Sequence, residues 1–503
     1  MQQQKRSRFG PAAALAAATL VTTSVLAGCA TGRDEAAGQV RNIIYLLGDG
    51  MGRSHITAAR ERFYGASGRL TMERLPHIGA VSTYAVEPNS AQPVLVTDSA
   101  SAATAWSSGV KTYNAAIGVD AYGTSVPTLM EQAKAAGFAT GNVTTAEVTD
   151  ATPAAMYSHA LLRSCQGPVF SESSCLPKKA DGGYAAAPDD KTVTTPIARQ
   201  IARTATADVI FGGGLSRFTP DDQKLLQDNG YTVLGSMGDP AVSVQTAAGQ
   251  RTATRQDLGT ISGDKVVGLF NRGNMTVEHA KSALPDTAPQ RQEPSLTEMT
   301  VAAIDLLSKA KGSKGFLLQV EGAQIDKRSH TNEAAQALGE LKAFDDAVAA
   351  AVDFARRDGH TLVIVTADHE GGGLGIVEPG NFTNAESASP PPNVDRGNPA
   401  NNGIPLRDKE QLLDPDRSRG PLNAPQADPR TFAPATLRTP DDPAATADGS
   451  PDASLWLAYL YGDHTGADVQ IYSFGPGSEA FATTQDNTEL YTKMHAALLR
   501  SSR

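Results

Sequence analysis

Three runs of apolar residues in this chain are each followed by acidic side chains. They are 42–47, followed by Asp49; 315–320, followed by Glu321 and Asp326; and 361–366, followed by Asp368. Continuous apolar runs of this length, separated by helical patterns, are typical of parallel strands that are buried on both faces. Because ligands bind beyond the carboxyl ends of such strands, the acidic groups are expected to converge on one site if the strands are neighbours.

Histidines accompany these acids at spacings that suit a metal ion. His330 follows Asp326 by four residues, which places both on one face of a helix, although solvated polar pairs often have the same spacing. His369 is adjacent to Asp368, and glycines nearby allow close approach of the backbone. His464 lies far downstream, before a last apolar run. The other histidines lack such a setting and are interpreted as structural or surface residues: His55, His77, His159, His279, His360 and His495.

Ser99 lies beside Asp98 at the start of an alanine-rich segment that is expected to be a helix. Asp and Ser are common helix N-caps, so an ordinary cap is one interpretation. The unpaired N–H groups and partial positive charge of a helix N-terminus would also suit a bound phosphate. The acid and histidine clusters elsewhere in the chain favour the second interpretation.

The intervening residues predict the elements that position these groups. Segments 300–311 and 333–357 have the apolar spacing of covering helices, and 137–143 is expected to be a further strand. The pattern predicts an α/β fold with a doubly wound, mostly parallel central sheet and helices on both faces. Within one domain spanning 40–503, the Pro-, Asn-, Asp- and Gly-rich segment 377–450 is expected to be a long surface insertion.

The N-terminus has the pattern of an export signal. A basic start is followed by an apolar, alanine-rich stretch over 11–27 that is short for a membrane span. It ends in Leu26-Ala27-Gly28-Cys29, which resembles a bacterial lipoprotein cleavage site. We therefore expect a signal peptide over 1–28, lipidation of Cys29, a tether over 29–39 and a periplasmic or cell-surface protein anchored to a membrane. A plain secretory signal and an uncleaved anchor are the alternatives.

The net charge of the chain bears on whether it binds nucleic acid. The formal net charge of −10 argues against non-specific binding to nucleic acid.

Apart from Cys29 the chain has only Cys165 and Cys175. In an oxidising compartment a disulfide between them is expected, with two free thiols as the alternative.

In chain order, the motifs resemble those of the alkaline phosphatase family. The matching stretches are 45–52, 96–119, 141–168, 321–330, 366–373 and 463–466. The resemblance covers essentially residue 40 to the C-terminus, and Ala115 departs from it because the family often has glycine there. It implies hydrolysis of phosphate monoesters through a phosphoserine intermediate, with two Zn²⁺ and one Mg²⁺ per chain. It also implies a homodimer, although the anchor and the insertion are compatible with a monomer.

The resemblance assigns a role to each matching residue. Ser99 corresponds to the nucleophile and Arg163 to the phosphate-binding arginine. The ligands of the first zinc correspond to Asp326, His330 and His464. Those of the second zinc correspond to Asp49, Asp368 and His369. Those of magnesium correspond to Asp49, Thr152 and Glu321. Asp150 and Lys327 correspond to a charged pair beside the ligands.

Elementary chemistry agrees with this assignment. Four carboxylates with three divalent ions leave a net charge of +2, which complements a phosphate dianion. Zinc suits the positions that contain histidine, and magnesium suits the position that contains only oxygen ligands.

A sulfatase would need Cys or Ser in a Cys/Ser-x-Pro-x-Arg motif, which the sequence around Ser99 lacks. A phosphodiesterase would typically have a threonine nucleophile and no equivalent of Arg163. A binding lipoprotein without turnover would have lost the nucleophile or a ligand.

Overall fold

The computed structural model describes residues 39–238, 249–261, 263–376, 433–434, 456–460 and 462–500. By internal contacts the chain divides into two units, 1–37 and 38–503, and all described residues belong to the second. The predicted signal peptide, Cys29, and the insertion except for its short strand at 433–434 therefore lie outside the described residues. None of the described helices is both long and apolar enough to cross a membrane.

A ten-stranded sheet forms the centre, with the strand order β19-β2-β18-β12-β1-β11-β5-β6-β10-β7. Its strands are β1 (Asn42–Gly48), β2 (His77–Ser82), β5 (Ala139–Glu147), β6 (Val209–Gly213), β7 (Thr232–Leu234), β10 (Val266–Leu269), β11 (Phe316–Gly322), β12 (Thr361–Thr366), β18 (Val469–Phe474) and β19 (Thr484–Asp486). From β12 to β7 all neighbours are parallel, whereas β18 is antiparallel to both β12 and β2. The sheet is thus mixed and mostly parallel, as predicted.

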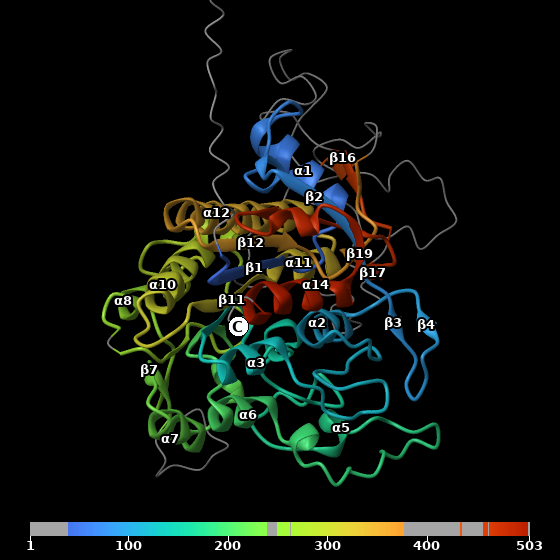
Figure 1. Ribbon diagram of the computed structural model, residues 1–503, viewed down its shortest axis with the longest axis vertical. Coiled ribbons are helices and arrows are strands. Elements are labelled where there is room, and N and C mark those ends of the chain that lie inside the picture. The colour runs from blue at the N-terminus through green and yellow to red at the C-terminus, as the bar shows by residue number, and fades with distance from the viewer. Residues whose placement is uncertain are drawn as a thin grey trace, which may run out of the picture. The chain divides into compact units, whose positions relative to one another are not determined.

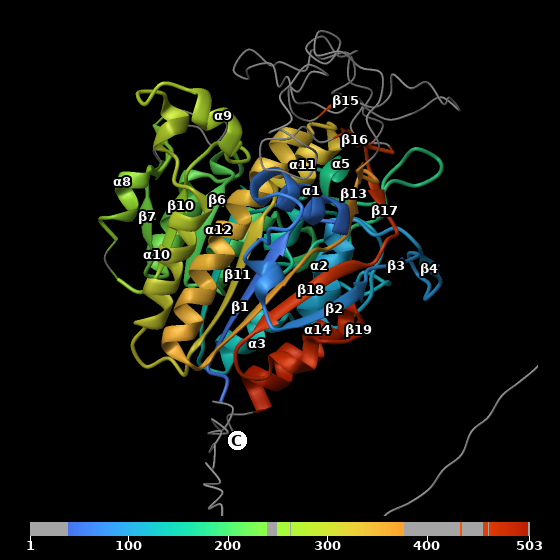
Figure 2. The ribbon, with the colours of Figure 1, turned by 90° about the horizontal axis from the view of Figure 1, so that it is seen from above.

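The three apolar runs are adjacent strands. β1 lies between β11 and β12, with Leu47 opposite Glu321 on one side and Thr366 on the other. Their carboxyl ends therefore reach the same edge of the sheet. Figure 2 shows α11 (Gln324–His330), β13 (Glu370–Gly371) and β17 (His464–Thr465) gathered at that end of the strands. The register confirms that the acid-bearing strands are neighbours.

Helices cover both faces of the sheet (Figure 1). One layer contains α1 (Arg53–Tyr64), α10 (Leu296–Ser308) and α12 (Ala334–Asp358), and the other contains α2 (Ser99–Ser108), α3 (Leu129–Ala135) and α14 (Asn487–His495). α12 presents an apolar stripe that includes Leu341, Phe344 and Val348, all fully buried. It ends at Gly359, which adopts φ 73° without the steric cost of a Cβ.

Further elements surround this core. The remaining α-helices are α4 (Ala151–Ala154), α5 (Glu172–Cys175), α6 (Ile197–Thr204), α7 (Pro220–Asp228), α8 (Arg255–Leu258) and α9 (Glu278–Ala283). The strands are β3 (Ala85–Val86), β4 (Pro93–Val94), β8 (Ser236–Met237), β9 (Gln250–Arg251), β14 (Gly375–Ile376), β15 (Ala433–Pro434) and β16 (Trp456–Ala458). β13 and β17 pair with each other and so join the segment after β12 to the segment before β18.

Candidate active site

Asp49, Asp368 and His369 form a buried cluster at the ends of β1 and β12. Nε2 of His369 lies 3.0 Å from Oδ2 of Asp368 and 3.7 Å from Oδ1 of Asp49. Oδ1 of Asp368 accepts hydrogen bonds from the backbone N–H groups of Gly50 and His369. These bonds fix the carboxylate so that its other oxygen faces the cluster. The three ligand atoms are close enough to share one metal ion.

Ser99 is the first residue of α2, and its hydroxyl belongs to the same cluster. Ser99 Oγ lies 3.2 Å from Nε2 of His369, and the side chain is buried. Asp98 is the N-cap of α2, because its Oδ1 accepts a hydrogen bond from the N–H of Ser101 over 2.9 Å. Asp98 is therefore an ordinary cap, and the cap holds Ser99 at the helix N-terminus beside the metal-ligand candidates.

A second cluster consists of Asp326 and His330 from α11 and His464 from β17. Nε2 of His330 lies 3.0 Å from Oδ2 of Asp326 and 3.3 Å from Nε2 of His464. Nδ1 of His330 lies 2.8 Å from the carbonyl oxygen of Gly462, and Nδ1 of His464 lies 3.1 Å from that of Thr97. Because a carbonyl only accepts, these contacts place the ring protons on Nδ1 and leave both Nε2 atoms facing the cluster.

The charge balance of the two clusters fits bound cations. Oδ1 of Asp49 and Oδ1 of Asp326 are buried without a hydrogen-bond partner among the described residues, a costly arrangement for a carboxylate. Burial and the neighbouring carboxylates, Asp368 first, raise the pKa of Asp49 well above its usual value. Burial opposes the charged form of His330, but Asp326 outweighs it and raises the pKa of His330 to about 9. A cation would replace the protons that these groups otherwise retain.

The remaining predicted ligands, Glu321 and Thr152, both offer buried oxygen atoms. Burial raises the pKa of Glu321 to about 7, although a hydrogen bond from Thr144 partly offsets the shift. Thr152 lies in α4, and its buried hydroxyl has no hydrogen-bond partner in the described part of the chain. Glu321 also contributes to the raised pKa of Asp49. Buried carboxylate and hydroxyl oxygens of this kind are the donors that Mg²⁺ prefers.

Acidic residues orient both Arg163 and Lys327, and the two cations share Asp150 as a partner. Arg163 donates to Oδ2 of Asp98 over 3.2 Å and to Oδ1 of Asp150 over 3.0 Å. Lys327 donates to Oδ2 of Asp150 over 2.7 Å. Although burial opposes ionisation of Asp150, Lys327 and Arg163 outweigh it and hold the pKa of that carboxyl well below its usual value. Both cations remain charged and oriented by fixed carboxylates.

Ala115 and the cysteines support the position of Arg163. Ala115 adopts φ 76°, the left-handed region that favours glycine, and its carbonyl oxygen accepts a hydrogen bond from the N–H of Arg163 over 2.6 Å. This conformation gives a physical reason for the glycine that the family often has there. Cys165, two residues after Arg163, is joined to Cys175 by a disulfide.

One acidic residue near the clusters has no role in the sequence-based assignment. Glu370 accepts hydrogen bonds from the N–H groups of Gly373 and Leu374 and from the hydroxyl of Thr465, which joins the His369 and His464 segments. The run Asp368-His369-Glu370 is the signal that could have pointed to it. His55 is fully buried, and its Nε2 lies 3.0 Å from Oγ of Ser329 in α11, which agrees with a structural residue.

The fold and the two buried clusters beside a helix N-terminal serine are those of a metal-dependent hydrolase. The family model described as alkaline phosphatase matches residues 40–390, and the chain belongs to the alkaline phosphatase family. It is therefore an enzyme that hydrolyses phosphate monoesters.

Known relatives agree over most of the chain. Alkaline phosphatase from Escherichia fergusonii is 35% identical over 491 residues, covering 91% of this chain and 86% of that protein. Alkaline phosphatase from Escherichia coli K12 is 41% identical over 354 residues, covering 65% and 70%. The solved structure of alkaline phosphatase from the Antarctic bacterium TAB5 has a TM-score of 0.58 and 26% identity, covering 92% of this chain and 98% of that one. A variant of the TAB5 enzyme has Mg bound in a site named M3.

Proposed function

We propose that this enzyme hydrolyses phosphate monoesters through a phosphoserine intermediate on Ser99. The observation that carries the proposal is the position of Ser99 Oγ, at the N-terminus of α2 and 3.2 Å from Nε2 of His369 in a buried Asp/His cluster. The hydroxyl attacks the phosphorus atom, the ester P–O bond breaks, and the alcohol leaves with a proton. Water then hydrolyses the phosphoserine, which releases inorganic phosphate and restores the hydroxyl.

The proposed ligand sets are the two Asp/His clusters and a third set that combines Asp49 with the buried oxygen atoms of Thr152 and Glu321. Asp326, His330 and His464 would hold one zinc ion, and Asp49, Asp368 and His369 the other. Asp49, Thr152 and Glu321 would hold one magnesium ion. When bound at the clusters, zinc would lower the pKa of the serine hydroxyl and stabilise the attacking and leaving oxygens of an in-line displacement.

The protein's own cations bind and orient the phosphate. The guanidinium of Arg163 can donate to two phosphate oxygens in a fork while Asp98 and Asp150 fix its direction. Lys327, held by Asp150, adds a positive charge on the same side. The N-terminus of α2 contributes its partial positive charge at Ser99. These groups position the phosphorus atom for attack and favour the dianion over neutral esters.

A substrate panel tests the reaction class. Purified enzyme is assayed with p-nitrophenyl phosphate, bis-p-nitrophenyl phosphate and p-nitrophenyl sulfate, and zinc and magnesium are measured in the same sample. We expect kcat/KM for the monoester to exceed the other two by several orders of magnitude, with two zinc ions and one magnesium ion per chain. Preferential hydrolysis of the diester or the sulfate ester, with full metal content, would overturn the proposal.

We also propose that the enzyme is exported and anchored by a lipid on Cys29, where it acts on organic phosphates outside the cytoplasm. The support is the sequence pattern around Leu26 to Cys29. Replacing Cys29 by Ser should move the activity from the membrane fraction to the soluble fraction, or leave an unprocessed precursor, without changing the catalytic constants. Retention of mature protein in the membrane fraction would count against lipidation.

A homodimer is likewise proposed, and light scattering of the detergent-solubilised enzyme tests it.

A further inference from the structure

Glu370 is a buried acid that directly follows His369 but belongs to neither of the two Asp/His clusters. Both of its carboxylate oxygens accept hydrogen bonds. Oε1 accepts from the N–H of Leu374 over 3.1 Å, and Oε2 accepts from the N–H of Gly373 over 3.0 Å and from the hydroxyl of Thr465 over 2.6 Å. A buried carboxylate is costly unless donors satisfy it, so these three bonds fix the side chain in one place.

These bonds join two segments that carry ligands of different proposed zinc sites. The two N–H donors lie in the turn that follows His369, whereas Thr465 directly follows His464. The imidazole rings of His369 and His464 are stacked, with their centroids 3.5 Å apart. The position of one ring relative to the other therefore depends on how the two segments are held together.

The backbone link between the two segments is short. β13 and β17 pair at two positions, and the backbone of Gly372 adds hydrogen bonds to Asp463 and Leu460. Pairs of strands as small as this are marginal in water without further contacts. The bond between the carboxylate of Glu370 and the hydroxyl of Thr465 supplies a side-chain contact across the pair.

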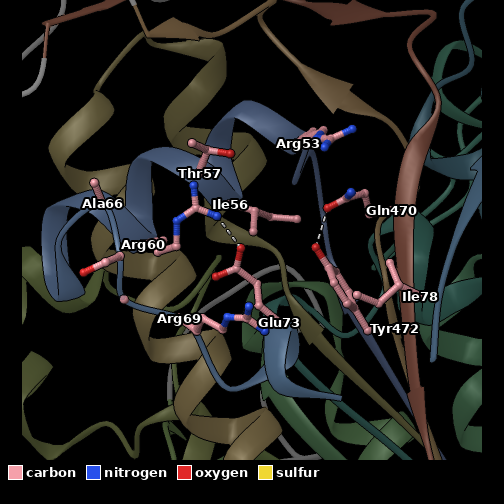
Figure 3. Close-up of a pocket in the computed structure, with 12 residues that line it drawn as sticks. Arg53, Ile56, Thr57, Arg60, Ala66, Arg69, Glu73, Ile78, Gln470 and Tyr472 are labelled. Carbon is pink, nitrogen blue, oxygen red and sulfur yellow. Dashed lines mark hydrogen bonds and ion pairs between the residues drawn. The ribbon is translucent and has the colours of Figure 1, made fainter. Parts of the chain in front are cut away.

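Glu370 also packs against the segment that follows Asp49. A Cβ on Gly52, the residue before α1, would lie 2.1 Å from Cγ of Glu370, so glycine at this position leaves room for the acid. α1 has support of its own, because Arg60 forms an ion pair of 2.6 Å with Glu73 in the segment after the helix (Figure 3). Loss of the Glu370 side chain should therefore act mainly on the two segments that it joins by hydrogen bonds.

We propose that Glu370 is a positioning residue that holds the two zinc sites in register with each other. It accepts from the turn after His369 and from Thr465, and so fixes the spacing between the imidazoles of His369 and His464. This role rests on the proposed zinc ligands and adds no step to the reaction. Groups that orient metal ligands in this way typically change metal affinity by about 10–100-fold when they are removed.

Zinc release into an excess of a chromogenic chelator tests this role without relying on turnover. Both zinc ions should leave Glu370→Ala about tenfold faster than they leave the parent. Thr465→Val removes one hydrogen bond and keeps the shape of the side chain, so it should accelerate release by about threefold. Thr465→Ser keeps the hydroxyl and should release zinc like the parent. The variant that combines Glu370→Ala with Thr465→Val should be no faster than Glu370→Ala, since the same bond is already lost.

Glu293→Ala is the matched control. Glu293 is also buried and also accepts three hydrogen bonds, from the N–H and hydroxyl of Thr276 and from the side-chain amide of Asn271. These partners are not next to any proposed zinc ligand. Loss of Glu293 should therefore lower the melting temperature without accelerating zinc release.

The role of Glu370 is overturned if Glu370→Ala releases zinc at the parental rate, if Glu293→Ala accelerates release equally, or if the effects of Glu370→Ala and Thr465→Val multiply. If Glu370→Ala does not fold, equal release rates for Thr465→Val and Thr465→Ser would overturn it. Failure of the ligand sets themselves would look different. The parent would then hold fewer than two zinc ions, or His464→Ala would keep both, and the role of Glu370 would fall with them.

Discussion

Lys327 donates a hydrogen bond to Oδ2 of Asp150 over 2.7 Å, while the other oxygen of that carboxylate accepts from Arg163. One acid thereby orients two cations of the site. We interpret Lys327 as a group that attracts phosphate in substrate and product alike, which amounts to uniform binding and contributes little to the chemical step.

Replacing Lys327 by Ala should therefore raise KM and weaken inhibition by inorganic phosphate, each by about tenfold. If product release limits turnover, kcat should stay level or rise. Steady-state kinetics at saturating metal measure both effects. Lys342→Ala, which removes a lysine paired with Asp346 on the surface of α12, is the matched control and should change neither constant. An unaltered inhibition constant for phosphate in Lys327→Ala would place this lysine outside the site.

Replacing Ser99 by Ala should lower turnover of phosphate monoesters by several orders of magnitude while metal content and fold persist, because the variant lacks the nucleophilic oxygen. Ser108→Ala is the control, since Ser108 is the last residue of the same helix, and its hydroxyl donates to the carbonyl of Thr104 and accepts from the N–H of Val110. Trapping labelled phosphate on the parent at acidic pH should place the label on Ser99. A Ser99→Ala enzyme with parental kcat and full metal content would refute the assignment.

Removal of the metals should abolish activity and lower the melting temperature, because the buried carboxylates of Asp49, Asp326 and Asp368 would then lose their compensating charge. Dialysis against a chelator, followed by metal analysis, calorimetry and assay, measures these effects. Zinc together with magnesium should restore both properties. Full activity in a preparation shown to be free of metal would contradict the proposed ligand sets.

Glu340 of α12 should make stability depend on pH. Burial, followed by the charge of Glu278, raises the pKa of Glu340 to about 7 from an ordinary 4.5. Between these values the folded chain binds a proton that the unfolded chain does not, so this group's contribution to stability falls as pH rises, by up to about 3 kcal/mol. Glu340→Gln stays neutral, so its melting temperature should exceed that of the parent at about pH 8 but not at about pH 5. The exposed control Glu87→Gln should show no such trend, and an equal shift for Glu340→Gln at both pH values would exclude the effect.

Loss of the Cys165–Cys175 bond should destabilise the segment that carries Arg163. The bond joins cysteines ten residues apart, and a loop of this size corresponds to about 2–3 kcal/mol in the chain-entropy description. Cys165→Ser with Cys175→Ser should therefore lower the melting temperature and raise KM. The reduced parent should resemble this double variant. Mass spectrometry of the unreduced mature protein would contradict the prediction if it found two free thiols.

Much of the fold could be predicted because its signals are local. The apolar runs that became β1, β11 and β12 are complete in themselves, and the acids that follow them mark the strand ends. The four-residue spacing of Asp326 and His330 likewise reflects the turn of one helix, α11. Backbone propensity and hydrophobic periodicity act over a few residues, so the sequence alone carried these features.

Only the tertiary structure decided which distant groups meet. His464 approaches His330, 134 residues away in sequence, because β17 pairs with β13. The bond between Asp98 and Arg163 and the left-handed conformation of Ala115 have no signature in residue spacing. Each depends on strand register, side-chain packing and charge neutralisation across the whole sheet, and these are settled only when the complete core assembles.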